Sequence, residues 1–232
     1  MIESEKYYTE SLYPLQDGIL NIVGHLNLPF YLTGGTALSR HYFHHRYSDD
    51  IDLFVNNDGN FGSYVDRLFS AFAEEETRGA FSIDASTISK REMSAQVFIK
   101  SQTGTRLKID LVNDIAAHYG ELVIDPQLGR VDSWRNILSN KVAALYRFEP
   151  KDVGDIWVIS KNLSFSWKQI FNEAISKELA VDPIAAAEIL RGIPAEYLSA
   201  IKWVEPIDEE QFKLNIEVIA NDIVRGNDNS LA

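Results

Sequence analysis

The chain has 232 residues, of which 45% are hydrophobic and 24% charged, a composition typical of a folded globular protein. A formal net charge of −12 argues against a plain DNA- or RNA-binding module, which would carry a basic excess, although a local basic patch could still meet one nucleic-acid end. No cysteine occurs, which excludes disulfides and thiolate metal sites and favours a cytoplasmic protein. We expect no transmembrane helix, because no apolar run approaches about 20 residues, and no signal peptide, because the N-terminal residues are acidic and lack an apolar segment.

A strand, a glycine turn and a helix are predicted near the start of the chain. Residues 1–29 carry apolar side chains at helical spacing and predict one or two helices at the edge of a sheet. Residues 30–33 are apolar and β-prone, and they end at Gly34-Gly35, where positive φ and close approach of a phosphate are allowed. Thr36 is expected to cap the next helix, whose buried face is formed by Ala37, Leu38, His41, Tyr42 and His45. Phosphate oxygens would be favoured at that helix start.

The next strand carries two carboxylates. Residues 50–55 alternate, so that Asp50 and Asp52 face one side and the apolar residues face the other. Two acids at this spacing lie about 7 Å apart by Cα and can converge on divalent cations, which prefer oxygen ligands. An Asp-x-Asp pair by itself is most often a solvated strand face. The glycine turn and helix upstream favour a metal site instead.

A third carboxylate follows on a later strand. After a turn cluster at 56–60, the pattern predicts a helix over 61–76 and then strands at 81–88, 95–100 and 106–112. In the last of these, Asp110 lies opposite the core-facing Leu107, Ile109 and Leu111. It is the further acid that a two-metal site needs, and it is equally compatible with an ordinary surface position.

The second half of the chain reads as helical. Residues 115–129 are expected to be a connection, after which Asp132 or Ser133 can cap a helix that runs to Phe148. Glu149-Pro150 ends it, and a second helix carries Asp152, Asp155, Ile156 and Ile159 on one face. Three or four more helices reach residue 224, and residues 226–232 look frayed. We therefore expect an αβ half at 1–128, a helical half at 129–232 and a site in the cleft between them.

Three histidines invite a zinc interpretation. Only His41 and His45 share a helix face, His44 does not, and no Glu-x-x-His pattern or cysteine accompanies them. Helix-surface histidines are the favoured interpretation.

The ordered set of motifs resembles a known family. Gly34 to Leu38, followed by Arg46, Ser48 and Asp50-Ile51-Asp52-Leu53, is similar to nucleotidyltransferases of the DNA polymerase β type, and more narrowly to the AbiEii/AbiGii toxins of type IV toxin–antitoxin systems. The helical half adds the matching segments Asn140 to Leu145, Arg147 and Lys151 to Asp155. The resemblance spans about residues 30 to 160, and residues beyond it match nothing that we can name.

This resemblance implies the fold and the roles of individual residues. The fold would be α+β, with a polymerase-β-like core of a mixed sheet flanked by helices and a helical C-terminal half. Asp50 and Asp52 match the metal-holding pair and Asp110 the third carboxylate. The positions matching nucleotide-binding elements are Gly34, Gly35, Thr36, Ser48, Lys141, Asp152 and Asp155. Asp49 is an additional acid beside the pair.

For three of these residues the sequence leaves a structural alternative open. Lys141 is either the cation that meets the triphosphate or a snorkelling lysine on a half-buried helix. Asp152 and Asp155 either line the site or form a structural ion pair, with Arg147 or Lys151 as partner.

The favoured function is transfer of an NMP from an NTP to a hydroxyl, assisted by two Mg²⁺ (or Mn²⁺) ions, with Asp110 accepting the proton. The resemblance implies a toxin that acts on a tRNA 3′ end or a protein, with a possible cognate antitoxin. Two alternatives stay open: a small-molecule adenylyltransferase of the aminoglycoside type, and a catalytically idle domain that binds nucleotide or a partner. A basic groove would favour RNA, and its candidate residues are Arg40, Arg46, Lys108 and Lys141.

Overall fold

The structure is a computed structural model that describes residues 3–232. Its contacts divide the chain into two compact units. The first, which we call the sheet unit, comprises residues 1–41, 47–115 and 122–132; the second, the helical unit, comprises residues 42–46, 116–121 and 133–232. The boundary that the sequence suggests, between residues 128 and 129, stays a prediction. Within the described residues, no helix is both long and apolar enough to span a membrane.

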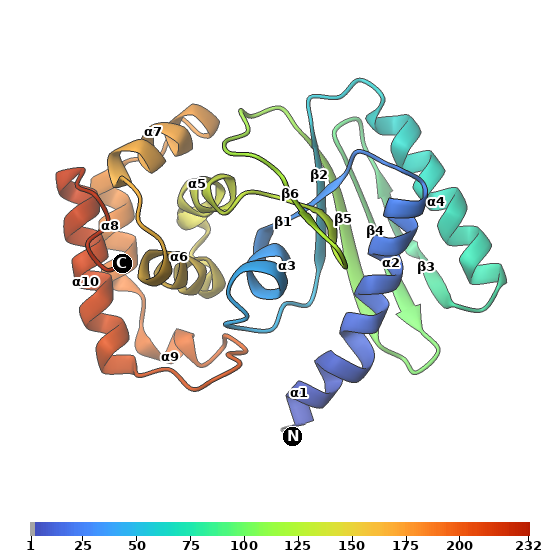
Figure 1. Ribbon diagram of the computed structural model, residues 1–232, viewed down its shortest axis with the longest axis horizontal. Coiled ribbons are helices and arrows are strands. Elements are labelled where there is room, and N and C mark those ends of the chain that lie inside the picture. The colour runs from blue at the N-terminus through green and yellow to red at the C-terminus, as the bar shows by residue number, and fades with distance from the viewer. Residues whose placement is uncertain (1–2) are drawn as a thin grey trace. The chain divides into compact units, whose positions relative to one another are not determined.

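A seven-stranded mixed sheet organises the first unit (Figure 1). Its strand order is β3-β4-β5-β2-β1-β7-β6, so that β2 pairs antiparallel with β1 on one side and parallel with β5 on the other. The strands are β1 (Tyr31–Thr33), β2 (Ile51–Asn56), β3 (Phe81–Lys90), β4 (Ser94–Ser101), β5 (Arg106–Asp114), β6 (Val123–Asp125) and β7 (Gly129–Val131). Strands β2 to β5 confirm the four strands predicted at 50–55, 81–88, 95–100 and 106–112, and their ends differ from the predicted ones by at most two residues.

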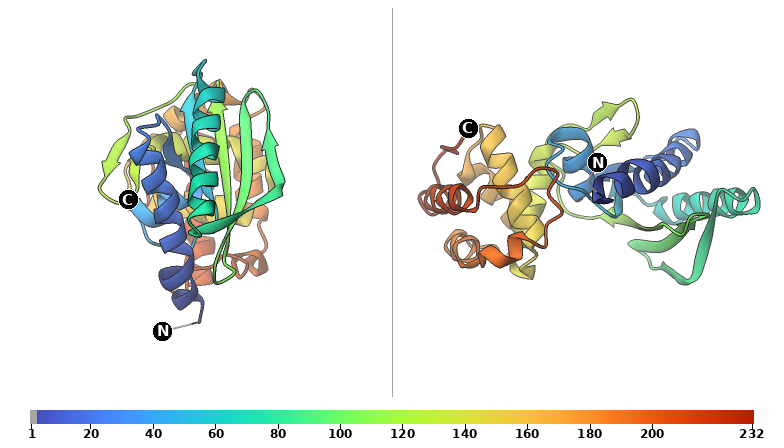
Figure 2. Two further views of the ribbon diagram at one scale, coloured as in Figure 1. Left: turned by 90° about the vertical axis from the view of Figure 1, so that its right-hand side faces the viewer. Right: turned by 90° about the horizontal axis from the view of Figure 1, so that it is seen from below.

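Helices cover one face of this sheet. The helical segments of the unit are α1 (Glu3–Tyr7), η1 (Tyr8–Leu12), α2 (Tyr13–His25), α3 (Gly34–Ala37), η2 (Leu38–Tyr42, whose last residue groups with the helical unit) and α4 (Phe61–Thr77). Figure 2 shows α2 and α4 side by side over the strands. Helix α4 buries Phe61, Val65, Leu68 and Phe72 at helical spacing, and the alternate residues Ile51, Leu53 and Val55 of β2 are buried as well.

Residues 115–129 are not a plain connection, as the sequence suggested. They contain β6, and β7 begins at their end, forming an antiparallel hairpin. Strand β7 also pairs parallel with β1, through Leu32 and Val131. Each strand is only three residues long, so no alternation pattern could develop in the sequence to reveal it.

The second unit is helical, as expected. Its segments are α5 (Trp134–Ala144), η3 (Leu145–Arg147), α6 (Pro150–Asn162), α7 (Trp167–Lys177), α8 (Pro183–Gly192), α9 (Ala195–Leu198) and α10 (Glu209–Arg225). Ser133 caps α5 by accepting a hydrogen bond from the Asn136 amide, as predicted, and Pro150 occupies the first turn of α6. The four residues expected on one face of α6, Asp152, Asp155, Ile156 and Ile159, are all buried, and burial extends around the helix, because residues 152–160 are buried without interruption. Helix α6 is therefore the central helix of this unit.

The C-terminal tail is anchored rather than frayed. Asn229 is buried, and its Nδ2 donates to the carbonyl oxygens of Ser160 (2.7 Å) and Leu163 (2.8 Å) at the end of α6. Ser230 donates to the Asp222 carboxylate. These amide and hydroxyl contacts are specific to the fold, and the polar composition of the tail concealed them.

Candidate active site

The glycine turn joins β1 to α3, and Gly34 has a φ of +67°, as the sequence predicted. A Cβ on Gly34 would lie 2.6 Å from Asp52 Oδ2, so that carboxylate lies directly against the turn. Thr36 does not cap the helix, which already begins at Gly34. Its buried hydroxyl donates instead to the Asp50 carbonyl and lies 2.9 Å from Ser48 Oγ. Thr36 thus fixes the segment leading to Asp50.

Replacing Gly34 with alanine is expected to destabilise the protein by at least about 1–2 kcal/mol, because an L-residue is strained at positive φ and its Cβ would displace Asp52. Urea unfolding measures the effect. Gly59→Ala is the matched control, since a Cβ there meets nothing within 4 Å. Equal stability of the two variants would contradict the described turn.

Two candidate acids occupy neighbouring positions on the sheet, and a third lies just before it. Asp52 of β2 pairs in register with Asp110 of β5 on one side and with Thr33 of β1 on the other. Asp50 lies one residue before β2 and two residues before Asp52, a spacing that puts both on the same side of an extended chain. Adjacent strands lie about 4.8 Å apart, so the Asp52 and Asp110 backbones are that close. The register therefore places Asp110 beside Asp52, and Asp52 lies against the glycine turn.

A lysine lies among these carboxylates. Lys108 precedes Asp110 by two residues on β5, and its Nζ is 2.6 Å from Asp110 Oδ2. Burial opposes the charged amine, but the carboxylates of Asp110, Asp50 and Asp52 outweigh it and raise the pKa of Lys108. The Lys108 ammonium therefore provides a positive charge close to the three carboxylates.

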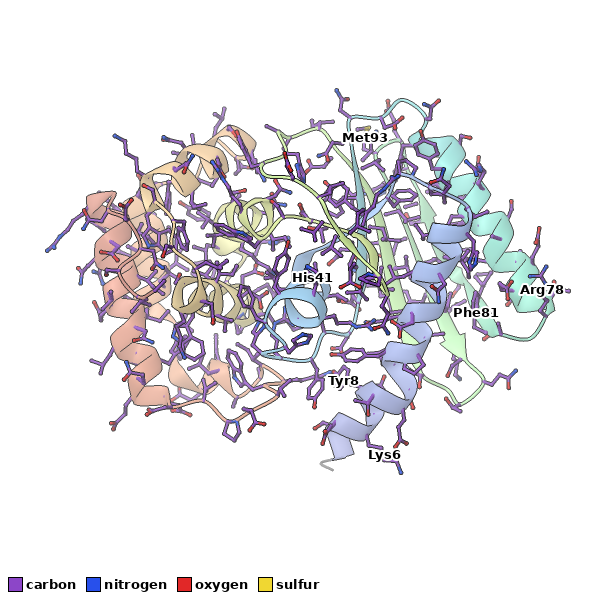
Figure 3. All side chains as sticks on the ribbon, viewed as in Figure 1. Lys6, Tyr8, His41, Arg78, Phe81 and Met93 are labelled. Carbon is purple, nitrogen blue, oxygen red and sulfur yellow. The ribbon has the colours of Figure 1, made fainter. Side chains whose placement is uncertain are left out.

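The additional acid, Asp49, is held apart by the N-terminal helical segment. The Tyr8 hydroxyl donates a hydrogen bond to Asp49 Oδ1, and the Tyr8 ring stacks on Tyr47 at 4.2 Å and 9° (Tyr8 is labelled in Figure 3). Gln16 donates to the carbonyl of Ser48 at 3.1 Å. Burial, reinforced by Asp49, raises the pKa of the Tyr8 phenol, so it remains a donor. Sequence reasoning missed both contacts, because they join residues 32 or more positions apart.

A fully buried acid beside the turn was also missed. The Asp132 side chain accepts a hydrogen bond of 2.5 Å from the Thr33 hydroxyl, and its backbone amide donates to the Leu32 carbonyl. The sequence suggested Asp132 only as a possible helix cap. Its actual contacts fix the end of β1, where the glycine turn begins.

In the helical unit, Asp155 is the centre of a buried ionic network. Arg46 contacts it with two hydrogen bonds, from Nε at 2.7 Å and from a terminal nitrogen at 2.9 Å. His45 Nε2 lies 2.9 Å from Asp155 Oδ1, and Lys141 Nζ lies 2.9 Å from Oδ2. Burial opposes ionisation, but Arg46 and Lys141 outweigh it and hold the pKa of Asp155 well below its usual range.

Lys141 is shared between two acids. Its Nζ lies 2.6 Å from Asp152 as well as 2.9 Å from Asp155, and burial of the amine is outweighed by these carboxylates, which raise the pKa of Lys141. Arg147 reaches Asp152 only at 3.7 Å and is largely exposed. The expected partners, Arg147 and Lys151, are therefore not the principal ones; Arg46 and Lys141 are.

The four cations proposed for a basic groove are each bound to acids. Arg40 pairs with Asp17 at 2.6 Å, and Lys108, Arg46 and Lys141 make the ion pairs described above. A groove of unpaired basic side chains is therefore not formed by these residues.

The histidines are used separately. His41 Nδ1 lies 2.7 Å from Asp125, whereas His45 contacts Asp155. The helix predicted to carry both ends at Tyr42, and His44 has a φ of +52°. Across the part of the chain that the structure describes, no three His, Cys, Asp or Glu side chains are arranged to hold one metal ion.

Comparison with known proteins identifies the family. A family model described as nucleotidyl transferase AbiEii toxin, type IV toxin–antitoxin system, matches residues 21–224. The chain belongs to the AbiEii nucleotidyltransferase toxin family. A search of curated proteins found no match to this AbiEii member.

Solved structures show that the fold of this AbiEii member is shared. MenT4, a nucleotidyltransferase toxin from Mycobacterium tuberculosis H37Rv, is similar with a TM-score of 0.65 and 12% identity, covering 92% of this chain and 82% of that one. JHP933 from Helicobacter pylori is similar with a TM-score of 0.58 and 18% identity, covering 92% and 90%. The expected α+β, polymerase-β-like nucleotidyltransferase fold is confirmed.

Proposed function

We propose that this protein transfers an NMP from an NTP to an acceptor hydroxyl and acts as the toxin of a type IV toxin–antitoxin system in the cytoplasm. The observation that carries the proposal is the pairing of Asp52 with Asp110 on neighbouring strands, with the Asp52 carboxylate against Gly34. Acids beside a glycine turn supply the charge and the close backbone approach that a nucleotide and its cations need.

The donor set fits divalent metal ions. Asp50, Asp52 and Asp110 would hold Mg²⁺ or Mn²⁺, which prefer carboxylate oxygens, and the charge of Lys108 among them indicates a place that favours a cation. Bound ions would lower the pKa of the acceptor hydroxyl and offset charge on the phosphates. The carboxylates must turn from Lys108 toward the ions, because their present arrangement holds no three-ligand cluster among the described residues.

The glycine turn would bind phosphate oxygens. The backbone of Gly34 and Gly35 can approach them closely, and Ser48 is the candidate hydroxyl contact. The Thr36 hydroxyl is already engaged with the Asp50 carbonyl, so in this proposal Thr36 acts by fixing Asp50. In this proposal Asp110 accepts the proton from the acceptor hydroxyl.

In the helical unit, we propose that three residues act together: Lys141, Asp152 and Asp155. The two acids keep Lys141 charged, and that charge is what a triphosphate contact requires. Asp155 has no exposed surface and contacts Arg46, so it acts by positioning Lys141. Asp152, which holds Lys141 at 2.6 Å, is the acid that a triphosphate would compete with.

A direct assay tests the proposal. The protein is incubated with each α-labelled NTP, Mg²⁺ and either total tRNA, total protein or a set of aminoglycosides. Label on tRNA or protein that disappears on chelation of Mg²⁺ supports the proposed function and identifies the acceptor. Adding a cognate antitoxin to the same reaction shows whether it suppresses the labelling. Label on an aminoglycoside would indicate the small-molecule adenylyltransferase. No label with any NTP would contradict the proposed activity and favour an idle domain.

Replacing Lys108 with glutamine is expected to tighten Mn²⁺ binding about tenfold, because the ammonium no longer competes with the ion for the carboxylates. Isothermal titration of Mn²⁺ measures this without any turnover. Lys100→Gln, an exposed lysine on β4, is the control and should leave the affinity unchanged. Weaker binding in the Lys108 variant would contradict a cation site among these acids.

A further inference from the structure

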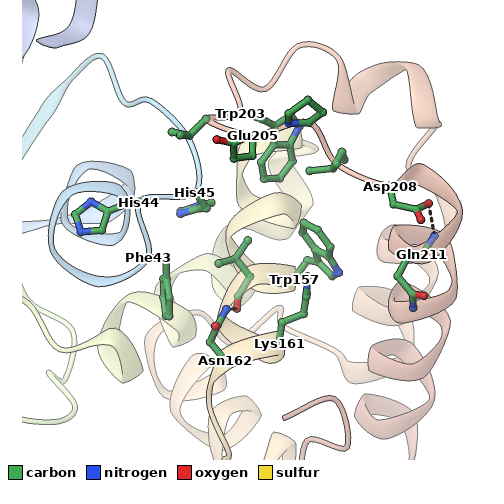
Figure 4. A pocket seen from close by; sticks show the side chains of 14 residues that line it. Phe43, His44, His45, Trp157, Lys161, Asn162, Trp203, Glu205, Asp208 and Gln211 are labelled. Carbon is green, nitrogen blue, oxygen red and sulfur yellow. Dashed lines mark hydrogen bonds between the residues drawn. The ribbon is translucent and has the colours of Figure 1, made fainter. Parts of the chain in front are cut away.

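The helical unit contains a cavity of about 380 Å³ that the proposed transfer reaction does not use. Its wall consists of residues 43–45, one side of α6 and the segment 203–208 (Figure 4). The backbone closes this wall, since Val204 donates to the His45 carbonyl at 3.0 Å and Arg46 forms a β-bridge with Trp203. The cavity is therefore a built feature of this unit.

Aromatic rings line the cavity. Trp157 and Trp203 meet edge to face, with ring centroids 5.8 Å apart and an interplanar angle of 87°. The ring centroid of His45 lies 6.2 Å from that of Trp203, and the ring centroid of Phe43 lies 6.2 Å from that of His45. An arrangement of several aromatic faces around one space is the kind of site that binds an organic cation. Lys161 already demonstrates this, because its ammonium lies 4.5 Å from the centroid of the Trp157 ring.

His45 supplies a hydrogen-bond acceptor without a partner. Its side chain is 7% exposed, and Nε2 donates to Asp155, whose ionised carboxylate accepts. In the neutral imidazole the other nitrogen, Nδ1, then carries a lone pair. Nδ1 is buried and has no hydrogen-bond partner among the described residues. A ligand with N–H donors would satisfy it.

The charge at the rim favours a positive ligand. Glu205 is exposed and has no hydrogen-bond or ion-pair partner in the part of the chain that the structure describes, whereas Asp208 is used as the N-cap of α10. The residues that line the cavity thus include two acids, Glu205 and Asp208, and one lysine, Lys161. A phosphate-bearing ligand would be repelled, and a cation would be attracted.

We propose that this cavity binds an alkylguanidinium or alkylammonium group, which stacks against Trp157 and Trp203 and donates to His45 Nδ1. Such a group occurs in free polyamines and in arginine or lysine side chains of proteins. Glu205 adds a charged contact at the rim, and Lys161 competes for the same ring.

Indole N–H resonances offer a direct measurement on the full-length protein. The chain has four tryptophans. Titration with butylguanidinium should shift the signals of Trp157 and Trp203 and leave Trp134 and Trp167, which do not line the cavity, unchanged. Butylurea, the neutral isostere, should produce no saturable shift. Saturable shifts of equal affinity with butylurea, or none with butylguanidinium at millimolar concentration, would overturn the proposal.

Matched variants sharpen the result. Glu205→Gln should weaken butylguanidinium about fivefold, whereas Glu209→Gln, which removes the same charge outside the cavity, should not. Lys161→Met should tighten binding, because the competing ammonium is gone. Weakening by Lys161→Met, or an equal effect of both glutamate variants, would contradict the assigned contacts.

A second arm distinguishes the sources of the cation. A tripeptide with a central arginine is compared with spermidine, and the same peptide with citrulline is the neutral control. Tighter binding of the arginine peptide assigns the cavity to a protein side chain, and tighter binding of spermidine assigns it to a free polyamine. Binding of the citrulline peptide as tightly as the arginine peptide would overturn the requirement for a cation.

Discussion

Replacing Asp52 with asparagine is expected to lower nucleotide transfer roughly 10³-fold or more while the fold stays intact. Asparagine has the shape of aspartate, so it still fits against Gly34, but it lacks the charge that a metal ion needs. The initial rate of label transfer from the labelled NTP, at saturating Mg²⁺, measures the loss. The thermal unfolding midpoint shows that the fold is retained.

Asp66→Asn is the matched control, because Asp66 is an exposed acid of α4 whose ion pair with Lys90 lies on the surface. Its transfer rate should equal that of the unmodified protein. A fall of less than about tenfold in the Asp52 variant would reject Asp52 as a metal ligand. A large fall in both variants would point to a general effect of charge.

Replacing Asp155 with alanine is expected to destabilise the protein by about 3–5 kcal/mol, because it leaves Arg46 and Lys141 buried without their shared partner. Urea unfolding at neutral pH measures the difference. Glu188→Ala removes an exposed pair with Arg191 and should change stability by less than about 1 kcal/mol. Equal effects in the two variants would contradict the central place of Asp155.

The contribution of Asp155 also has a defined pH dependence. Although burial opposes ionisation, Arg46 and Lys141 depress the pKa of Asp155 in the folded protein. A depressed acid stabilises the fold above its unfolded pKa, about 3.9, and loses that effect as the pH falls through its folded pKa. The stability difference between the unmodified protein and Asp155→Ala should therefore be constant above about pH 5 and shrink below pH 4. A difference that grows on acidification would contradict this.

Local patterns predicted the parts of the fold that depend on nearby residues. Alternation of apolar side chains located β2 and β5, and it placed Asp52 and Asp110 each on the face of its strand opposite the buried apolar residues. The pair of glycines predicted the positive φ of Gly34. These features depend on a few consecutive residues, so they can be read without knowledge of the tertiary structure.

Features that depend on distant residues were out of reach. The sequence offered Arg147 and Lys151 as partners for Asp155, because they are close along the chain, whereas the actual partner Arg46 is 109 positions away. Likewise, nothing in a run such as Leu-Lys-Ile-Asp-Leu shows that the charges of Asp50 and Asp52 will lie near enough to raise the pKa of Lys108. Ion pairing inside a folded core is decided by which elements pack together, and no local pattern encodes that.

The contact between Tyr8 and Asp49 affects how the protein can be shortened. The family match begins at residue 21, so a fragment trimmed to that range would retain every candidate active-site residue. It would nevertheless lose Tyr8 and Gln16, whose side chains hold Asp49 and the Ser48 carbonyl immediately ahead of β2. A fragment chosen from the family match alone would therefore lack the side-chain contacts that hold the segment immediately before Asp50.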